Sequence, residues 1–149
     1  MADRYFIAGG ADNNWGSTAN WSATSGGTGG ASVPTAADAV FFDANSPNVT
    51  VNASNRVCLS LNFTGYTNTI TMTFSITVSG SVTLAAAMGI AGAGSLTINA
   101  TATLTSNGRT WPNPLTLTVL ATYTFADNWT VSGLVTIGVD KMQPSMETK

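Results

Sequence analysis

Residues 70–79 read ITMTFSITVS, and residues 96–105 read LTINATATLT. In both stretches an apolar side chain alternates with a hydroxyl or amide side chain. Because successive side chains of a β-strand point to opposite faces, this two-residue period predicts strands with one apolar and one hydroxyl face. The same alternation recurs over residues 57–64, 115–119, 123–125 and 129–131. The chain is therefore predicted to be all-β.

The composition supports that prediction and excludes an all-helical fold. Only 8% of the 149 residues are charged, against about a quarter in an ordinary soluble domain. Threonine favours strands, and asparagine and glycine favour turns, whereas the long helix-forming residues Glu, Gln, Lys and Arg are scarce. The length suits one domain with one sizeable core.

A short repeat indicates how the strands are connected. Residues 80–84 read GSVTL, residues 94–98 read GSLTI and residues 133–137 read GLVTI. A glycine followed by a short alternating strand suits a β-solenoid, and it equally suits a jelly-roll or sandwich. We divide the chain into a loop-rich aromatic N-terminal arm with the first strands (1–48), a β-strand body (49–138) and a polar C-terminal tail (139–149). The aromatic segment could also fold back onto the sheet.

The predicted hydroxyl face carries almost no charge. Between Arg56 and Asp127 the only charged residue is Arg109. Natural sheets protect flat faces and edges from mispairing with charges, prolines and bulges. An uncharged threonine face therefore predicts that the face is covered, either in a homo-oligomer, for which we expect a trimer, or in a larger assembly.

The missing residue types exclude several functions. A net charge of −2 with five basic residues argues against binding to nucleic acid or to an anionic membrane. The absence of histidine removes Ser-His and Cys-His nucleophile pairs and the commonest zinc ligand. We expect no cofactor, no metal site, no signal peptide and no transmembrane segment. The single cysteine, Cys58, has no evident activator and is interpreted as inert.

Asp38 and Asp43 form the only close carboxylate pair in a region predicted to fold. Five residues apart on a regular strand, they would point to opposite faces, so we predict that they cap turns and that the protein is not an enzyme.

The aromatic residues offer two interpretations. The four tryptophans could form a sugar-stacking platform or pack in the core. Trp129 is predicted to lie in the core, because it falls on the same side of the alternation as Val131. In the N-terminal segment, partner-binding anchors are predicted at Tyr5, Phe6, Trp15 and Trp21.

The N-terminal third resembles a family of tailed-bacteriophage virion proteins. The resemblance rests on NWGSTANWS at residues 14–22 and SGGTGGASVPTAADAVFFD at residues 25–43, followed by the Gly-Ser-Val/Leu-Thr repeats. It implies a structural protein of the virion, assembled in the host cytoplasm, that contacts its own copies and the major capsid protein or another virion protein. Long members of the family continue well beyond the position of Ile137, so the resemblance favours capsid decoration or cementing over host recognition.

Two alternatives from other classes remain open. A fibre, adhesin or carbohydrate-binding module on the virion would bind a surface glycan through exposed tryptophans. A polysaccharide-degrading β-helix would need carboxylates gathered in a groove, for which Asp38 and Asp43 are the candidates.

Overall fold

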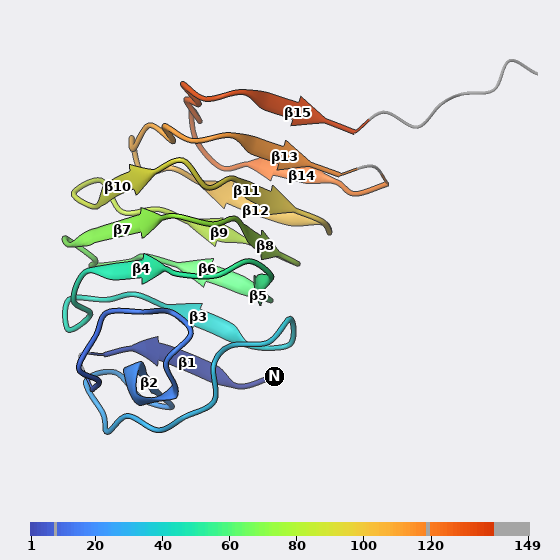
Figure 1. The fold of residues 1–149 in the computed structure, drawn as a ribbon. Coiled ribbons are helices and arrows are strands. Elements are labelled where there is room, and N and C mark those ends of the chain that lie inside the picture. Colours follow the sequence, from blue (N-terminus) through green and yellow to red (C-terminus); the bar gives the residue numbers. More distant parts are fainter. Residues whose placement is uncertain (8, 119, 139–149) are drawn as a thin grey trace, which may run out of the picture.

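A computed structural model describes residues 1–7, 9–118 and 120–138. In this part of the chain the backbone winds through about five turns of a β-solenoid, stacked in Figure 1 from the N-terminal base to β15 at the top. Apart from the short 3₁₀ helix η1 (Thr18–Asn20), the described residues form strands and loops. The all-β prediction is confirmed. The predicted tail at 139–149 lies outside the described residues.

Each turn contributes strands to successive flanks of the solenoid, so that equivalent strands line up in three sheets. Within the described residues the seven-stranded sheet has the order β14 (Tyr123–Phe125), β12 (Ala102–Thr105), β9 (Val82–Thr83), β6 (Ser60–Asn62), β3 (Ala39–Phe41), β1 (Asp3–Phe6), β2 (Trp21–Ser22). The five-stranded sheet has the order β15 (Val135–Ile137), β13 (Leu115–Leu117), β11 (Leu96–Ile98), β8 (Ile76–Val78), β5 (Arg56–Cys58). The three-stranded sheet has the order β10 (Gly89–Gly92), β7 (Thr69–Met72), β4 (Val49–Val51).

Parallel pairing decides between the two predicted architectures. Among the described strands every ladder is parallel except the antiparallel pair of β1 and β2. Jelly-rolls and sandwiches are built from antiparallel strands, so that alternative is wrong and the solenoid is confirmed. No helix in the described part of the chain is long and apolar enough to cross a membrane.

The turns are short, and their corners interrupt the strands predicted from the alternation. Contacts between equivalent positions join Asn113 to Gly94, 19 residues apart, and Thr103 to Ser81, 22 residues apart. Each long alternating stretch therefore passes around a corner. Residues 70–79 split into β7 and β8, and Phe74 at the corner between them is 42% exposed. In the alternation Phe74 is in phase with Ile70 and Met72, but it does not share their burial because the backbone changes direction there.

The core is a set of columns that run along the solenoid axis. In the five-stranded sheet Ile76, Leu96 and Leu115 lie in register, as do Val78, Ile98 and Leu117. All six side chains are buried. Stacking an apolar residue over its equivalent one turn away removes both from water. This burial stabilises the fold by about 25 cal/mol per Å² of apolar surface removed from water. The repeated alternation thus becomes a continuous interior.

The N-terminal segment is not a free arm. It contains β1, which pairs in parallel with β3, and β3 pairs with β6 of the next turn. The predicted boundary at residue 48 therefore falls inside the first turn of the solenoid. Between β1 and β3, the loops and η1 fold over the base of the molecule (Figure 1), as the second interpretation of the aromatic segment proposed.

The repeated glycines lie at corners where neighbouring turns come into close contact. A Cβ at Gly94 would overlap the backbone of Phe74, and a Cβ at Gly133 would overlap the backbone of Asn113. Neither glycine can be replaced by a residue with a side chain, because the atoms that a Cβ would meet are main-chain atoms, which cannot rotate away. The glycines of the repeat are thus required by the stacking of the turns.

We predict that Gly94→Ala destabilises the protein by about 1–3 kcal/mol, because the added methyl group forces the backbones of two turns apart. Urea unfolding followed by far-UV circular dichroism measures this change. Ala93→Ser, at the exposed neighbouring position, is the matched control and should leave the midpoint unchanged. Equal midpoints for Gly94→Ala and the wild type would contradict this account of the corner.

Candidate functional site

Three of the four predicted partner-binding residues lie in the core. Phe6, Trp15 and Trp21 are all 0% exposed. The rings of Trp15 and Trp21 meet edge to face with centroids 5.0 Å apart, and the Trp21 indole N–H donates to the Trp15 carbonyl at 2.6 Å. Phe42 packs against both of these rings, and Phe63 stacks on Phe42 at 4.9 Å. We call Phe6, Trp15, Trp21, Phe42 and Phe63 the aromatic cap.

The aromatic cap corrects the predicted role of these side chains. Phe6, Trp15 and Trp21 present no ring surface to a partner, because they cover the otherwise open lower end of the columns. Only Tyr5 keeps part of its ring at the surface, where it stacks on Phe41 with centroids 4.8 Å apart. Its role as an anchor stays a prediction.

Asn20, which the sequence analysis did not single out, holds the loops of the cap together. It is fully buried. Its amide nitrogen donates to the backbone carbonyls of Asp12 and Asn14, at 2.8 and 3.1 Å, and its amide oxygen accepts from the N–H of Gly10 at 2.8 Å. A single buried amide thus pairs backbone groups of three loop residues, which no periodic pattern signals.

Asp38 and Asp43 are turn caps, as predicted. The Asp38 carboxylate accepts from the backbone N–H and hydroxyl of Thr35, at 3.0 and 2.7 Å, and from the N–H of Ala2 at 3.2 Å. Burial alone would raise the pKa of Asp38, but these hydrogen bonds and the charge of Arg4 lower it below its usual value. Asp43 accepts from the N–H of Asn45 at 2.8 Å. Each carboxylate thus caps its own turn and also accepts from a distant residue, Asp38 from Ala2 and Asp43 from the Ser25 hydroxyl.

The remaining side chains considered for chemistry are also enclosed. Cys58 is fully buried, and burial raises the pKa of its thiol, so the thiol stays protonated. Trp111 is fully buried, in agreement with core packing, and Trp129 is half-buried against Phe125. Three or more Asp, Glu, His or Cys side chains arranged to hold a metal ion are not found among the described residues.

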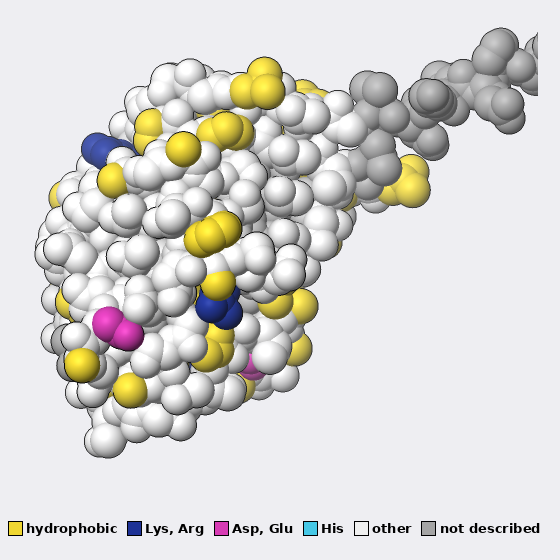
Figure 2. Space-filling model, viewed as in Figure 1, with side chains coloured by type: hydrophobic (Ala, Val, Ile, Leu, Met, Phe, Trp, Pro, Cys, Tyr) yellow, Lys and Arg dark blue, Asp and Glu magenta, His cyan; other side chains and the backbone are white. Residues whose placement is uncertain are grey.

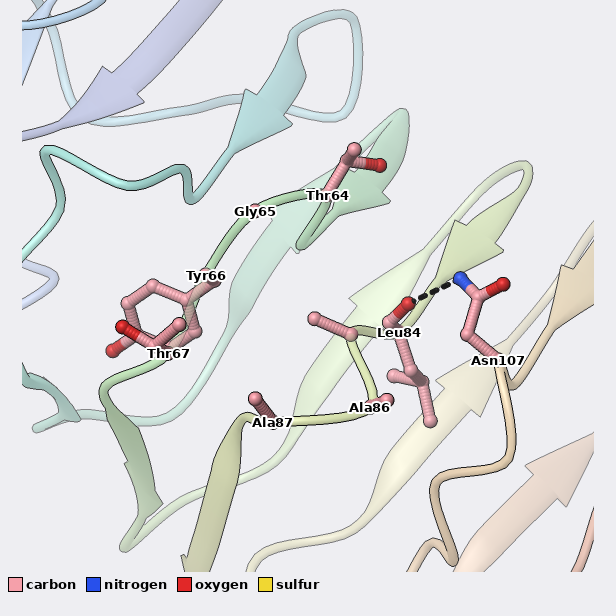
Figure 3. Close-up of a pocket in the computed structure, with 9 residues that line it drawn as sticks. Thr64, Gly65, Tyr66, Thr67, Leu84, Ala86, Ala87 and Asn107 are labelled. Atoms are coloured by element: carbon pink, nitrogen blue, oxygen red, sulfur yellow. Dashed lines mark hydrogen bonds between the residues drawn. The ribbon is translucent and has the colours of Figure 1, made fainter.

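A shallow pocket of about 300 Å³ lies where three successive corners stack (Figure 3). Its walls come from residues 64–67, residues 84–87 and Asn107. The Asn107 amide donates to the Leu84 carbonyl at 2.8 Å, and the Tyr66 hydroxyl donates to the Pro47 carbonyl at 2.9 Å. Because these polar groups are already paired and the alanine walls are apolar, the pocket offers no catalytic arrangement.

The most unusual surface is the upper end of the solenoid. The two core columns of the five-stranded sheet continue into Val135 and Ile137 of β15. Leu115 and Leu117, one turn below, are 2% and 4% exposed, whereas Val135 and Ile137 are 44% and 63% exposed. The same change occurs in the seven-stranded sheet, where Phe125 is 49% exposed above the fully buried Leu104.

These inward positions are exposed because nothing stacks above the last turn of the described chain. Within the described residues β14 and β15 each have a strand partner on one side only. Their outer edges therefore present backbone N–H and C=O groups beside apolar side chains. We call the surface formed by Phe125, Val135 and Ile137 the open end.

The turn that carries the open end is firmly attached to the turn below. The Tyr123 hydroxyl donates to the carbonyls of Ile98 and Thr118, at 2.9 and 3.0 Å. The Asp127 carboxylate accepts the backbone N–H groups of Ser106 and Asn107, at 2.8 and 2.7 Å. The open end is therefore a defined surface that the hydrogen bonds of the last turn hold in place.

Comparison with known proteins identifies no relative. No family model matches the chain, and neither the curated proteins nor the solved structures contain a match.

We predict that Trp15→Ala and Trp21→Ala each destabilise the protein by about 3–5 kcal/mol, because each leaves a large cavity in the aromatic cap. Chemical unfolding monitored by tryptophan fluorescence and circular dichroism measures the loss. Tyr5→Ala removes a half-buried ring from the same segment and should cost less than either. Unchanged stability of the tryptophan variants would restore their role as surface anchors.

A second prediction concerns pH. The N–H groups of Ser106, and then of Asn107, lower the pKa of Asp127 below its ordinary value of 3.8. A lowered pKa in the folded state stabilises the protein above pH 3.8, and the benefit is lost as the pH falls through the folded-state pKa. Asp127→Asn should therefore be less stable than the wild type at pH 7, with a difference that shrinks below pH 3.8. Thermal unfolding between pH 7 and pH 2 measures it, and a constant difference would exclude this role.

Proposed function

We propose that this chain is a structural, non-catalytic subunit of a tailed-phage virion, and that it decorates or cements the particle by packing a flank of its β-solenoid against other virion proteins. The support from the sequence is the resemblance of residues 14–43 to phage virion proteins. The support from the fold is a rigid, short rod whose turns are locked by parallel ladders.

One observation carries the proposal, namely the outer face of the five-stranded sheet. Thr77, Thr97, Thr116 and Thr136 lie in register on four successive strands and form one outward column. Neighbouring strands are about 4.8 Å apart, so the column is a flat, regular row of methyl and hydroxyl groups. The charged side chains of the molecule are sparse on the face seen in Figure 2. On a free protein a flat uncharged β-face can pair wrongly with other chains. In a permanent contact the same face is covered by the partner.

The expected contact follows from the chemistry of the column. Threonine methyl groups bury apolar surface at little cost in side-chain entropy, and the hydroxyls form hydrogen bonds with a polar protein surface. Because no charge is needed, binding to the particle should be insensitive to salt. Many copies bound side by side would add weak contacts together. The aromatic cap takes no part in this contact, in contrast to the arm expected from the sequence.

The two alternatives lack a comparable observation. A glycan-binding module would use a platform of tryptophans, of which Trp15, Trp21 and Trp111 are fully buried and Trp129 is half-buried. A polysaccharide-degrading β-helix needs free carboxylates in a groove, whereas Asp38 and Asp43 accept hydrogen bonds within their own turns.

The test is co-sedimentation of the purified protein with phage particles that lack it. We expect the wild type to bind at both low and high salt, and the double variant Thr97→Lys with Thr116→Lys to bind at least tenfold less, because two desolvated charges would enter the contact. Thr103→Lys with Thr124→Lys places the same charges on exposed positions of the seven-stranded sheet and should bind like the wild type.

Absence of wild-type binding, or equal loss in both double variants, would reject the proposal. Binding of the wild type to a glycan array instead would favour the carbohydrate-binding alternative.

A further inference from the structure

The exposed apolar side chains of the molecule are concentrated at one end. Among the described residues seven large hydrophobic side chains are exposed, and five of them lie between residues 120 and 137, including the three of the open end. Val135, Ile137 and Phe125 occupy inward positions of the last turn, and their equivalents in the turns below are buried. The open end thus continues the core columns, with apolar side chains at the inward positions that are buried in the turn beneath.

The opposite end of the solenoid is closed. β2 pairs antiparallel with β1 and ends the seven-stranded sheet at the base, and the aromatic cap fills the interior next to it. Stacked repeats need a terminal cap to be soluble alone. This chain has such a cap at its base, whereas the described part of its last turn has none.

We propose that the open end binds the open end of a second copy of this chain, so that two solenoids join about a two-fold axis into one continuous core. The proposal goes beyond the virion function and does not depend on it. It names a dimer where the sequence analysis expected a trimer, because the apolar surface lies at one end of the rod and pairs most fully with its own image.

A second copy fits because the open end is its own complement. Between Thr110 and Gly138 the only charged residue is Asp127, whose carboxylate is bound by the backbone of the turn below. The described last turn of each copy therefore brings a single charged side chain toward the contact. The unpaired edges of β14 and β15 also face the same edges of the other copy, so each can supply the hydrogen bonds that the other lacks.

The closed base limits the assembly to two copies. Head-to-tail stacking would place an open end on the aromatic cap, where no free core layer exists. A contact between two identical surfaces closes on itself and leaves no further open end, so a filament is not formed.

The test is the native mass of the full chain, measured by light scattering over a hundredfold range of concentration. We expect a dimer that dissociates on dilution. Ile137→Lys should weaken the dimer at least a hundredfold while leaving circular dichroism unchanged, because the side chain is already 63% exposed in one copy. Thr103→Lys is the matched control, since Thr103 is exposed on β12, one turn below the end, and it should keep the wild-type mass.

Thiol cross-linking tests the symmetry. The only cysteine, Cys58, is fully buried, so Ile137→Cys carries one accessible thiol. A short bismaleimide should join two copies of Ile137→Cys, and should join copies of Thr103→Cys far less, because only the open ends meet.

Each outcome decides the proposal. A wild type that stays monomeric at all concentrations, a trimer, a ladder of higher oligomers, or a dimer that Ile137→Lys leaves intact would overturn it. A dimer that fails to bind phage particles would refute the virion function and leave the self-association standing. A monomer that binds particles through its threonine column would refute the self-association and support the virion function.

Discussion

The register of each turn on the turn below is the constraint on which the rest of the structure depends. Parallel ladders hold equivalent residues one above another, and this register converts a short apolar repeat into columns such as Ile76, Leu96, Leu115 and Val135. The same register aligns the threonines outside and brings corner backbones so close that Gly94 and Gly133 can carry no side chain. The core, the outer face and the glycine pattern are therefore consequences of one stacking interaction.

A stacked core has two ends, and in the described chain one end is covered while the other is exposed. At the base, Trp15 and Trp21 cover the columns, and the buried amide of Asn20 ties the covering loops together. At the top, Tyr123 and Asp127 fix the last turn while its inward side chains remain exposed. This difference between the ends gives the rod a direction, and in the proposed dimer it confines self-association to one surface.

The scarcity of charge connects both proposals. Side chains that would keep a free sheet soluble are missing from the outer threonine column, and residues 110–138 carry one carboxylate, Asp127, whose charge is stabilised by backbone N–H groups of the turn below. The flank and the end are separate surfaces, so a dimer formed through the ends could still lie with its flanks on a particle. In the described chain the Cys58 thiol is enclosed, and the Asp38 and Asp43 carboxylates cap turns.

Local periodicity was enough to predict strands, an all-β fold, the solenoid as one of two architectures, and capping roles for Asp38 and Asp43. These features depend on neighbours in the chain, which a sequence displays directly. The exposure of Phe74, the burial of Phe6, Trp15 and Trp21, and the role of Asn20 required the tertiary structure. Each depends on where the backbone turns and on which distant turn lies next to it. For the same reason Val135 and Ile137 read as ordinary core residues in sequence, and only the absence of a turn stacked above them in the described chain distinguishes them from Leu115 and Leu117.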